Sequence, residues 1–171
     1  MLTGTESEGE MAHEYKKLQT KLVHTGEPHP RVDGAIVQPI YQSSTYEYTH
    51  GAGYHDIKYV RLSNSPNHVS LNTKLAAIEN AEAAMACASG MAAISTALLT
   101  FLGSGDHLLC HNSLYGGTND LINRDFPELG IEATFLDACE PDTWKQHLRE
   151  NTKVFYVETI TNPTLVVADL P

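Results

Sequence analysis

Three short motifs hold the residues best suited to chemistry, and each stands where a strand is expected to give way to a helix or loop. The first runs from Ala88 to Ala93 as Ala-Ser-Gly-Met-Ala-Ala. Gly90 lets the backbone approach a ligand closely, and a following helix would direct free N–H groups and its positive dipole end to the same place. A phosphate group suits such a position, although a tight turn in an alanine-rich core explains the same residues.

The second motif is Leu114-Tyr115-Gly116-Gly117-Thr118, in which a tyrosine precedes two glycines. Because the glycines leave room, the Tyr115 ring can present a full face to a flat ligand ring, and its hydroxyl group can transfer protons. A tyrosine that simply packs on a loop is the alternative explanation.

The third motif, from Glu158 to Pro163, ends a strand with a carboxylate and continues into Asn162-Pro163. The Asn162 amide can donate a hydrogen bond to a phenolate oxygen on a cofactor ring. An ordinary Asn-Pro turn explains the same residues without any ligand.

Two further residues, Tyr59 and Arg61, lie in a stretch with an extended pattern. In a strand, positions two apart project to the same side. A tyrosine hydroxyl and an arginine guanidinium on one side form a good clamp for a phosphate group. A solvent-exposed strand edge is the alternative.

The chain has 171 residues and a net charge of −10, from 11 Lys and Arg against 21 Asp and Glu. This balance argues against nucleic acid or an anionic membrane surface as a main partner, because both require a basic face. No segment of the sequence is apolar for long enough to span a bilayer, and the acidic start from Met1 to Glu10 does not resemble a signal or transit peptide. We therefore expect a cytoplasmic protein.

Cysteines and histidines give little support for a metal site. Cys87, Cys110 and Cys139 are odd in number and widely spaced, which favours reduced thiols over a disulfide or a metal cluster. His107 and His111 flank an expected strand, but no third ligand stands at a suggestive spacing. We expect both histidines to be structural and no metal to be bound.

The first third of the chain has little helical periodicity. Residues 1–20 are expected to form a flexible tail. Residues 21–66 are rich in Pro, Gly, Ser, Thr and Tyr and are expected to form an extended arm, with turns at Glu27-Pro28, Asp33-Gly34 and Gly51-Ala52-Gly53. Such an arm cannot build a core of its own, so we expect it to contact a neighbouring subunit.

Residues 67–171 alternate between helical and strand patterns, which predicts an α/β fold. Crossovers of helical length predict a mostly parallel sheet with helices on both faces. Ligands bind outside the carboxyl ends of the strands in such sheets, where all three motifs fall. The expected strands cover residues 107–111, 131–136 and 154–157, and the expected helices cover 69–80, 91–102, 117–126 and 141–150, with Asn67 and Asp142 as N-caps, Gly103 after the second helix and Pro127 closing the third.

In this combination and order, the motifs resemble the Cys/Met-metabolism family of pyridoxal-phosphate (PLP) enzymes, which includes cystathionine γ-synthase, cystathionine β-lyase, cystathionine γ-lyase and methionine γ-lyase. The resemblance runs from about Thr20 to Pro171 and extends to Gln38–Tyr46, Gly105-Asp106-His107 and Asn151-Thr152-Lys153. It implies an incomplete sheet that forms the N-terminal part of the large domain of a fold-type I PLP enzyme, preceded by the extended arm.

By this resemblance, the backbone N–H groups of Gly90 and Met91 would bind the cofactor phosphate, with Ser89 at the same helix entrance. Tyr59 and Arg61 would reach across a subunit boundary and hold the phosphate in the neighbouring protomer. The resemblance thus implies a homo-oligomer, a dimer of dimers in the full-length protein.

The same resemblance makes Tyr115 the catalytic residue, which would stack on the pyridine ring and transfer a proton to the leaving group. Asn162 would bind the ring phenolate oxygen, and Glu158 would support the pocket from the strand end. The implied activity is cleavage of a C–S bond by β- or γ-elimination on sulfur amino acids such as cystathionine. γ-Replacement, as in cystathionine γ-synthase, is the alternative, because both reactions share these residues.

The chain departs from the family pattern in two ways. Tyr59-Val60-Arg61 leads to Asn64-Ser65-Pro66-Asn67, where the family usually has Asn-Pro-Thr. The family's pyridinium-pairing Asp, Schiff-base Lys and substrate-binding Arg belong further along, and Lys153, which precedes the strand leading to Glu158, is not that lysine. The sequence therefore predicts that the chain alone is inactive, and a catalytically inactive truncated chain or one half of a split enzyme is the alternative from another class.

Overall fold

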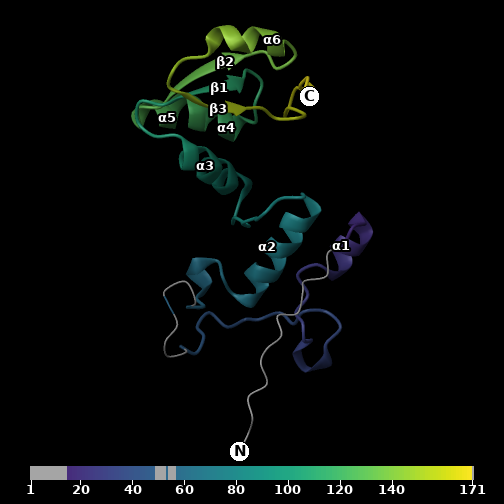
Figure 1. Ribbon diagram of the computed structural model, residues 1–171. Helices are drawn as coiled ribbons and strands as arrows, with labels where there is room; N and C mark the ends of the chain where they lie inside the picture. The colour runs from purple at the N-terminus through teal and green to yellow at the C-terminus, as the bar shows by residue number, and fades with distance from the viewer. Residues whose placement is uncertain (1–14, 49–52, 54–56, 171) are drawn as a thin grey trace, which may run out of the picture. The chain divides into compact units, whose positions relative to one another are not determined.

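The computed structural model describes residues 15–48, 53 and 57–170. The chain divides into two compact units, Met1–Ala86 and Cys87–Pro171. The first unit holds the arm, and the second holds the three motifs and the sheet whose elements are labelled in Figure 1.

A three-stranded parallel sheet forms the middle of the second unit (Figure 1). β1 (His107–His111) lies between β2 (Glu132–Leu136) and β3 (Thr152–Tyr156). Both neighbours pair with β1 in parallel, as predicted. Because the strands are parallel, their three carboxyl ends lie at the same edge of the sheet.

Helices return the chain between the strands and cover both faces of the sheet. In Figure 1, α6 lies on one side of the sheet, and α4 and α5 lie on the other. This architecture confirms the predicted α/β fold class. The helical segments are α3 (Gly90–Phe101), α4 (Gly116–Asp120) continuing through the π-helical turn η4 (Leu121–Asp125) into α5 (Phe126–Glu128), and α6 (Pro141–Trp144) continuing into the 3-10 turn η5 (Lys145–His147).

The side chains of β1 are buried on both faces of the sheet, so this strand joins two hydrophobic cores. Leu108 and Cys110 belong to the first core and Leu109 to the second, as the alternation of side chains along a strand requires. Burial on both faces explains the unbroken apolar run in the middle of β1. The first core also contains Leu98, Leu102, Leu114, Ile122, Phe126 and Ile131, and the second contains Ala138, Trp144 and Ala168.

All three helices predicted for the second unit differ from their predicted bounds by a residue or more. α3 begins at Gly90, one residue early, because Ser89 Oγ caps it by accepting the Ala92 N–H group at 3.1 Å. The helical segment that follows β1 was predicted to end before Pro127, but it does not end there. The segment continues through Pro127, which is the second residue of α5.

The helix predicted over residues 141–150 ends early. Thr152 N–H donates to the Arg149 carbonyl oxygen at 3.0 Å, and Arg149 N–H donates to Thr152 Oγ1 at 2.9 Å. These two bonds form a turn that leads into β3, so the helical segment stops before it. Asp142 was predicted to be the N-cap of this helix, but Glu140 occupies that position.

The first unit contains a helix that the sequence analysis did not predict. α1 (Leu18–His24) spans the border between the expected tail and the expected arm. Lys21 ties it to α2 (Pro66–Ile78) and the residues after it, because Nζ donates to the Ala77 carbonyl oxygen and to Asn80 Oδ1, each at 2.7 Å. Two short 3-10 turns interrupt the arm, η1 (Val32–Gly34) and η3 (Val60–Leu62).

α2 begins three residues earlier than predicted. Its N-cap is the buried Ser65, whose Oγ accepts the His68 N–H group. Asn67 is the predicted cap, but its side-chain amide pairs with the backbone of Tyr41 instead. Asn67 Oδ1 accepts the Tyr41 N–H group at 3.0 Å, and Nδ2 donates to the Tyr41 carbonyl oxygen at 2.7 Å. Asn67 therefore ties the arm to α2.

The arm buries little of its own apolar surface. Among the described residues of the first unit, only Ser65 and Ala76 are buried. Ile36 and Ile40, by contrast, are 74% and 86% exposed. The described part of the arm therefore has apolar side chains that no core covers, and its contact with another subunit stays a prediction. Most of the predicted tail and of the turn at Gly51-Ala52-Gly53 lies outside the described residues.

His107 is buried at the start of β1 and hydrogen-bonds to both neighbouring strands. Its Nδ1 lies 2.8 Å from Thr152 Oγ1 on β3, and its Nε2 lies 2.9 Å from Thr134 Oγ1 on β2. These contacts confirm the structural role predicted for this histidine. Burial lowers the pKa of His107, and the positive charge of Arg149 lowers it further, against a smaller opposite effect of Glu132.

We predict that the free energy of unfolding decreases as the pH falls below about 6.5. The folded-state pKa of His107 lies below the ordinary value of 6.5, so the unfolded chain takes up this proton first and the contribution of the neutral ring is lost toward acid. Urea unfolding across this range measures the slope. His107→Gln should make the slope shallower, and His147→Gln, at an exposed position, should not. A slope unchanged by His107→Gln would contradict this account.

Candidate cofactor site

The start of α3 offers backbone donors to a ligand. The first N–H groups of any helix lack acceptors within the helix. Of the three such groups inside α3, Ser89 satisfies one, because its Oγ accepts the Ala92 N–H group. The Ser89 carbonyl oxygen accepts the Ala93 N–H group, which is the first regular bond of the helix. The N–H groups of Gly90 and Met91 are thus the ones left for a ligand. An added Cβ on Gly90 would meet no described atom within 4 Å, so there is open space beside it.

The loop after β1 brings the Tyr115 ring close to α3. An added Cβ on Gly117 would lie 2.7 Å from Tyr115 Cε1, which is too close for a real side chain, and 3.0 Å from Met91 Sδ, which is a tight contact. Glycine at this position therefore lets the ring, the thioether and the backbone meet. Tyr115 remains 48% exposed, which leaves ring surface available to a flat ligand.

Glu158 connects the end of β3 to the same loop. Its two carboxylate oxygens accept the Tyr115 N–H group at 3.1 and 3.2 Å. A carboxylate acceptor makes this a comparatively strong hydrogen bond. The structure thus brings three of the predicted site residues, Met91, Tyr115 and Glu158, into one connected group at the carboxyl edge of the sheet.

Asn162 lies exposed on the loop that follows β3, and hydroxyl groups tie this loop to the one that carries Tyr115. Thr161 Oγ1 and Thr164 Oγ1 are 2.6 Å apart, and Thr164 Oγ1 is 2.5 Å from Ser113 Oγ. None of these three residues was predicted to be a site residue. The Ser and Thr residues beside both motifs were the available signal, because short hydroxyl side chains form such local bonds.

Tyr59 and Arg61 belong to the other unit, where the structure corrects their predicted conformation. Tyr59 is extended and bridges to Thr45, but Arg61 lies in the 3-10 turn η3, so the two residues are not on one side of a strand. They meet in another way, because the Arg61 guanidinium carbon lies 4.6 Å from the centre of the Tyr59 ring. This is a cation–π contact. A role for the pair at the phosphate stays a prediction.

The turn that departs from the family pattern is held by Asn64. Its Oδ1 accepts the Tyr59 N–H group at 2.8 Å, and its Nδ2 donates to the Ile57 carbonyl oxygen at 2.6 Å. These bonds brace the backbone on which Tyr59 and Arg61 stand.

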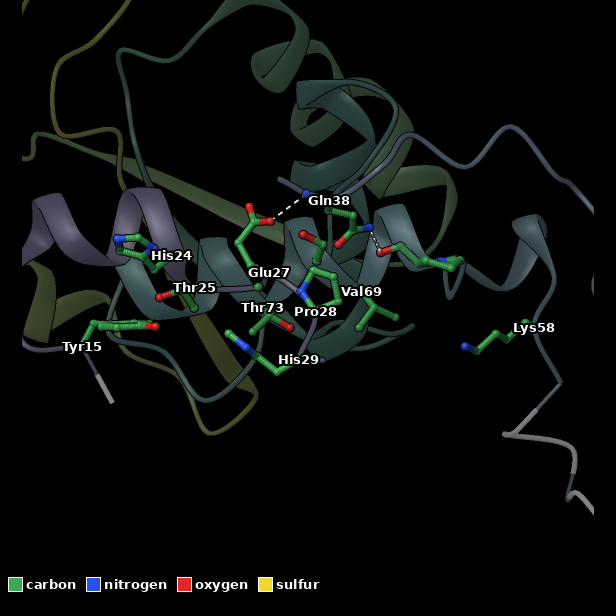
Figure 2. Close-up of a pocket in the computed structure, with 13 residues that line it drawn as sticks. Tyr15, His24, Thr25, Glu27, Pro28, His29, Gln38, Lys58, Val69 and Thr73 are labelled. Carbon is green, nitrogen blue, oxygen red and sulfur yellow. Dashed lines mark hydrogen bonds between the residues drawn. The ribbon is translucent and has the colours of Figure 1, made fainter. Parts of the chain in front are cut away.

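A hollow of about 380 Å³ in the first unit holds none of the predicted site residues (Figure 2). Across it, Glu27 Oε2 accepts the Gln38 N–H group at 2.7 Å, and the Gln38 side chain donates to the Pro66 carbonyl oxygen at 2.8 Å. Lys74 Nζ lies 3.6 Å from the other Glu27 oxygen. These contacts attach the arm to α2, which gives the polar residues a structural role.

Within residues 15–48, 53 and 57–170, no group of three His, Cys, Asp or Glu side chains is placed to hold a metal ion. In those same ranges, no helix is both long and apolar enough to cross a membrane. Cys87, Cys110 and Cys139 are free thiols. Burial raises the pKa of Cys110 to about 12, which keeps this residue protonated and unreactive.

Gly117→Ala should displace the Tyr115 ring, because the new methyl group would overlap Tyr115 Cε1 and crowd Met91 Sδ. The ring is partly exposed and can swing outward, so we expect a loss of stability of only about 1 kcal/mol. NMR should show the Met91 methyl resonance shifting as the ring leaves. Gly116→Ala is the matched control, since a Cβ there meets nothing within 4 Å. Equal Met91 shifts in the two variants would contradict the close approach at Gly117.

Comparison with known proteins identifies the family. A model for the family described as Cys/Met metabolism PLP-dependent enzyme matches residues 19–171. A probable cystathionine gamma-synthase of Herpetosiphon aurantiacus is 40% identical over 152 residues, covering 88% of this chain and 47% of that protein. A cystathionine gamma-lyase of Bacillus subtilis (strain 168) is 38% identical over 154 residues, covering 90% of this chain and 40% of that protein.

A solved structure shows the same likeness. The crystal structure of cystathionine gamma-lyase from Lactobacillus plantarum complexed with L-serine matches with a TM-score of 0.81 and 33% identity, over 90% of this chain and 40% of that one. This chain therefore spans less than half the length of the curated relatives it matches. The match to the family model nevertheless spans the residues of all three motifs and of the pair in the arm. By sequence and by fold, the chain belongs to the Cys/Met metabolism family of PLP-dependent enzymes.

Proposed function

We propose that this chain supplies the phosphate-binding and ring-binding part of a PLP site in an enzyme that cleaves the C–S bond of cystathionine-like sulfur amino acids by β- or γ-elimination. The observation that carries the proposal is the meeting of Met91, Gly117 and Tyr115. It joins a helix N-terminus, which suits a phosphate, to an exposed aromatic ring, which suits a pyridine ring. γ-Replacement is the second reaction supported, because one relative is named a probable cystathionine gamma-synthase.

The residues present fit the cofactor. Phosphate would occupy the open space beside Gly90 and accept from the N–H groups of Gly90 and Met91. The exposed part of Tyr115 would lie against the pyridine ring. Because Tyr115 and Met91 already meet at Gly117, one ligand carrying both a phosphate and a flat ring can engage both elements together.

PLP, when bound, supplies an electron sink that weakens the bonds at the substrate Cα. The residues of this chain would orient the reactants and move protons around it. Tyr115 would carry a proton on its Oη to the departing sulfur. Glu158 would hold the Tyr115 backbone in place, and the Asn162 amide would donate to the ring oxygen.

The two lysines of the second unit do not stand where this chemistry needs an amine. Lys153 is the second residue of β3, so it lies toward the amino end of the strand, whereas Glu158 follows the carboxyl end. Lys145 lines an apolar hollow with Trp144 and Phe155. We therefore propose that the lysine-dependent steps require a different residue and that this chain alone does not turn over substrate.

We also propose that the arm completes the phosphate site of a neighbouring subunit in a homo-oligomer, a dimer of dimers in the full-length protein. The contact between Arg61 and Tyr59 places a guanidinium and a phenol together, as a phosphate clamp requires. The exposed apolar side chains of the arm, such as Ile36 and Ile40, would gain stability by burial against a second chain.

Gly90→Ala should weaken phosphate binding without harming the fold. The new methyl group meets no described protein atom within 4 Å, but it fills space that the phosphate would occupy. We expect the affinity for pyridoxamine phosphate, measured by titration calorimetry, to fall at least about tenfold, with little change in Tm. This ligand lacks the aldehyde of PLP and so cannot condense with surface lysines.

Two controls make the Gly90→Ala result specific. Gly103→Ala changes a glycine just beyond the other end of α3, where a Cβ makes only ordinary contact with Asp106, and should keep the wild-type affinity. Pyridoxamine, which has the ring without the phosphate, should bind Gly90→Ala and wild type equally. Equal affinities of the two proteins for the phosphorylated ligand would overturn the phosphate site at α3.

A mixing experiment tests whether the arm acts across a subunit boundary. Gly90→Ala and Arg61→Ala should each bind pyridoxamine phosphate weakly. In a mixed dimer, one site would combine an intact α3 from one chain with an intact arm from the other. An equimolar, randomly mixed population of dimers should therefore regain tight binding at about one quarter of its sites. If each site were built from a single chain, mixing would restore none.

A further inference from the structure

Three hydroxyl groups form a chain of hydrogen bonds between the loops that carry Tyr115 and Asn162. Thr161 Oγ1 lies 2.6 Å from Thr164 Oγ1, which lies 2.5 Å from Ser113 Oγ. Ser113 stands two residues before Tyr115, and Thr161 and Thr164 stand on either side of Asn162. These hydrogen bonds therefore link the two motifs through side chains that were not predicted to be site residues.

One assignment of donors and acceptors satisfies all of these hydrogen bonds. Thr161 is buried, and its Oγ1 accepts the Val166 N–H group at 3.0 Å. A buried hydroxyl group needs an acceptor for its own proton, and Thr164 Oγ1 is within reach. Thr164 then has its own proton to donate to Ser113 Oγ. The series of hydrogen bonds thus runs from the Val166 N–H group to the loop that carries Tyr115.

The Asn162 loop also has a defined internal shape. Thr161 N–H donates to the Val166 carbonyl oxygen, and Leu165 N–H donates to the Thr161 carbonyl oxygen, each at 3.0 Å. Because the loop is closed on itself, it moves as a piece, and its bond to Ser113 sets where Asn162 lies relative to Tyr115. An exposed loop without that tie would have to be ordered when a ligand binds, at a cost in affinity.

We propose that Thr164 is a positioning residue for the cofactor, holding the Asn162 amide through Ser113 and Thr161 at the distance from Tyr115 that one pyridine ring requires. The inference rests on the proposed PLP site. It assigns to Thr164 no contact with the cofactor itself, so its effect must pass through Asn162.

The test is titration calorimetry of the full chain with pyridoxamine phosphate. Thr164→Val removes the hydroxyl group at nearly constant volume and should weaken binding about five- to tenfold, the equivalent of one hydrogen bond. Thr164→Ser keeps the hydroxyl and should bind like wild type. Ser113→Ala breaks the same bond from the other loop, so it should show a similar loss, and the double variant should lose no more than either single one. Ser113→Ala also provides the test if Thr164→Val fails to fold.

Asn162→Ala separates a positioning role from a general structural one. If Thr164 acts through Asn162, adding Thr164→Val to Asn162→Ala should cause no further loss of affinity. A further five- to tenfold loss in that background would overturn the inference, and so would wild-type affinity in Thr164→Val and Ser113→Ala. In both cases the proposed function would stand, provided that wild type prefers pyridoxamine phosphate to pyridoxamine. A wild-type chain without that preference would overturn the proposed function and this inference together.

Discussion

The candidate site depends on the complete burial of β1. All five residues of this strand are buried, and its apolar side chains alternate between two hydrophobic cores. A strand held from both faces and by parallel neighbours on both edges has little freedom to shift its register. The loops that leave the carboxyl ends of β1 and β3 therefore begin from fixed points. Tyr115 and Glu158 meet because of this arrangement, and α3 reaches them because it packs on the same core.

The charges of the predicted site residues bear on the role proposed for the arm. A phosphate group brings roughly two negative charges at neutral pH, yet the predicted site residues of the second unit include no cation. Glu158 is negative there, and its carboxylate is occupied by the Tyr115 N–H group. The α3 dipole and the N–H groups at its start supply partial positive charge. Arg61 is the predicted site residue with a full positive charge, and the proposal that a neighbouring chain supplies it would provide the missing cation.

Much of the second unit was predictable because its cores impose regular patterns. The bounds of β1 were predicted without error, because burial on both faces gives an unbroken apolar run, and α3, a long apolar segment that ends before Gly103, was displaced by one residue. The predicted N-cap of α2 was wrong. Asn67 hydrogen-bonds to the Tyr41 backbone instead, and Ser65 is the N-cap. That exchange depends on a contact between residues 26 positions apart, which local pattern cannot reveal.

The candidate site likewise has features that local sequence predicts and contacts that it does not. Its motifs were visible as types and spacings, whereas the contacts between them were not. The need for glycine at position 117 follows from where Tyr115 and Met91 come to lie, and the hydroxyl chain from Thr161 to Ser113 joins loops that are distant in sequence. The stacking of Arg61 on Tyr59 likewise replaced the strand geometry expected for that pair, because η3 turns the backbone between them.

The central claim is that the start of α3 and the Tyr115 loop bind one phosphorylated ring. An NMR titration of isotope-labelled chain with pyridoxamine phosphate tests it most directly, because each backbone amide reports its own environment. Our account predicts the largest shifts at the amides of Gly90, Met91 and Tyr115, with smaller shifts at Asn162. Shifts concentrated instead around Glu27 in the hollow of the first unit, or spread over the surface without a centre, would contradict it.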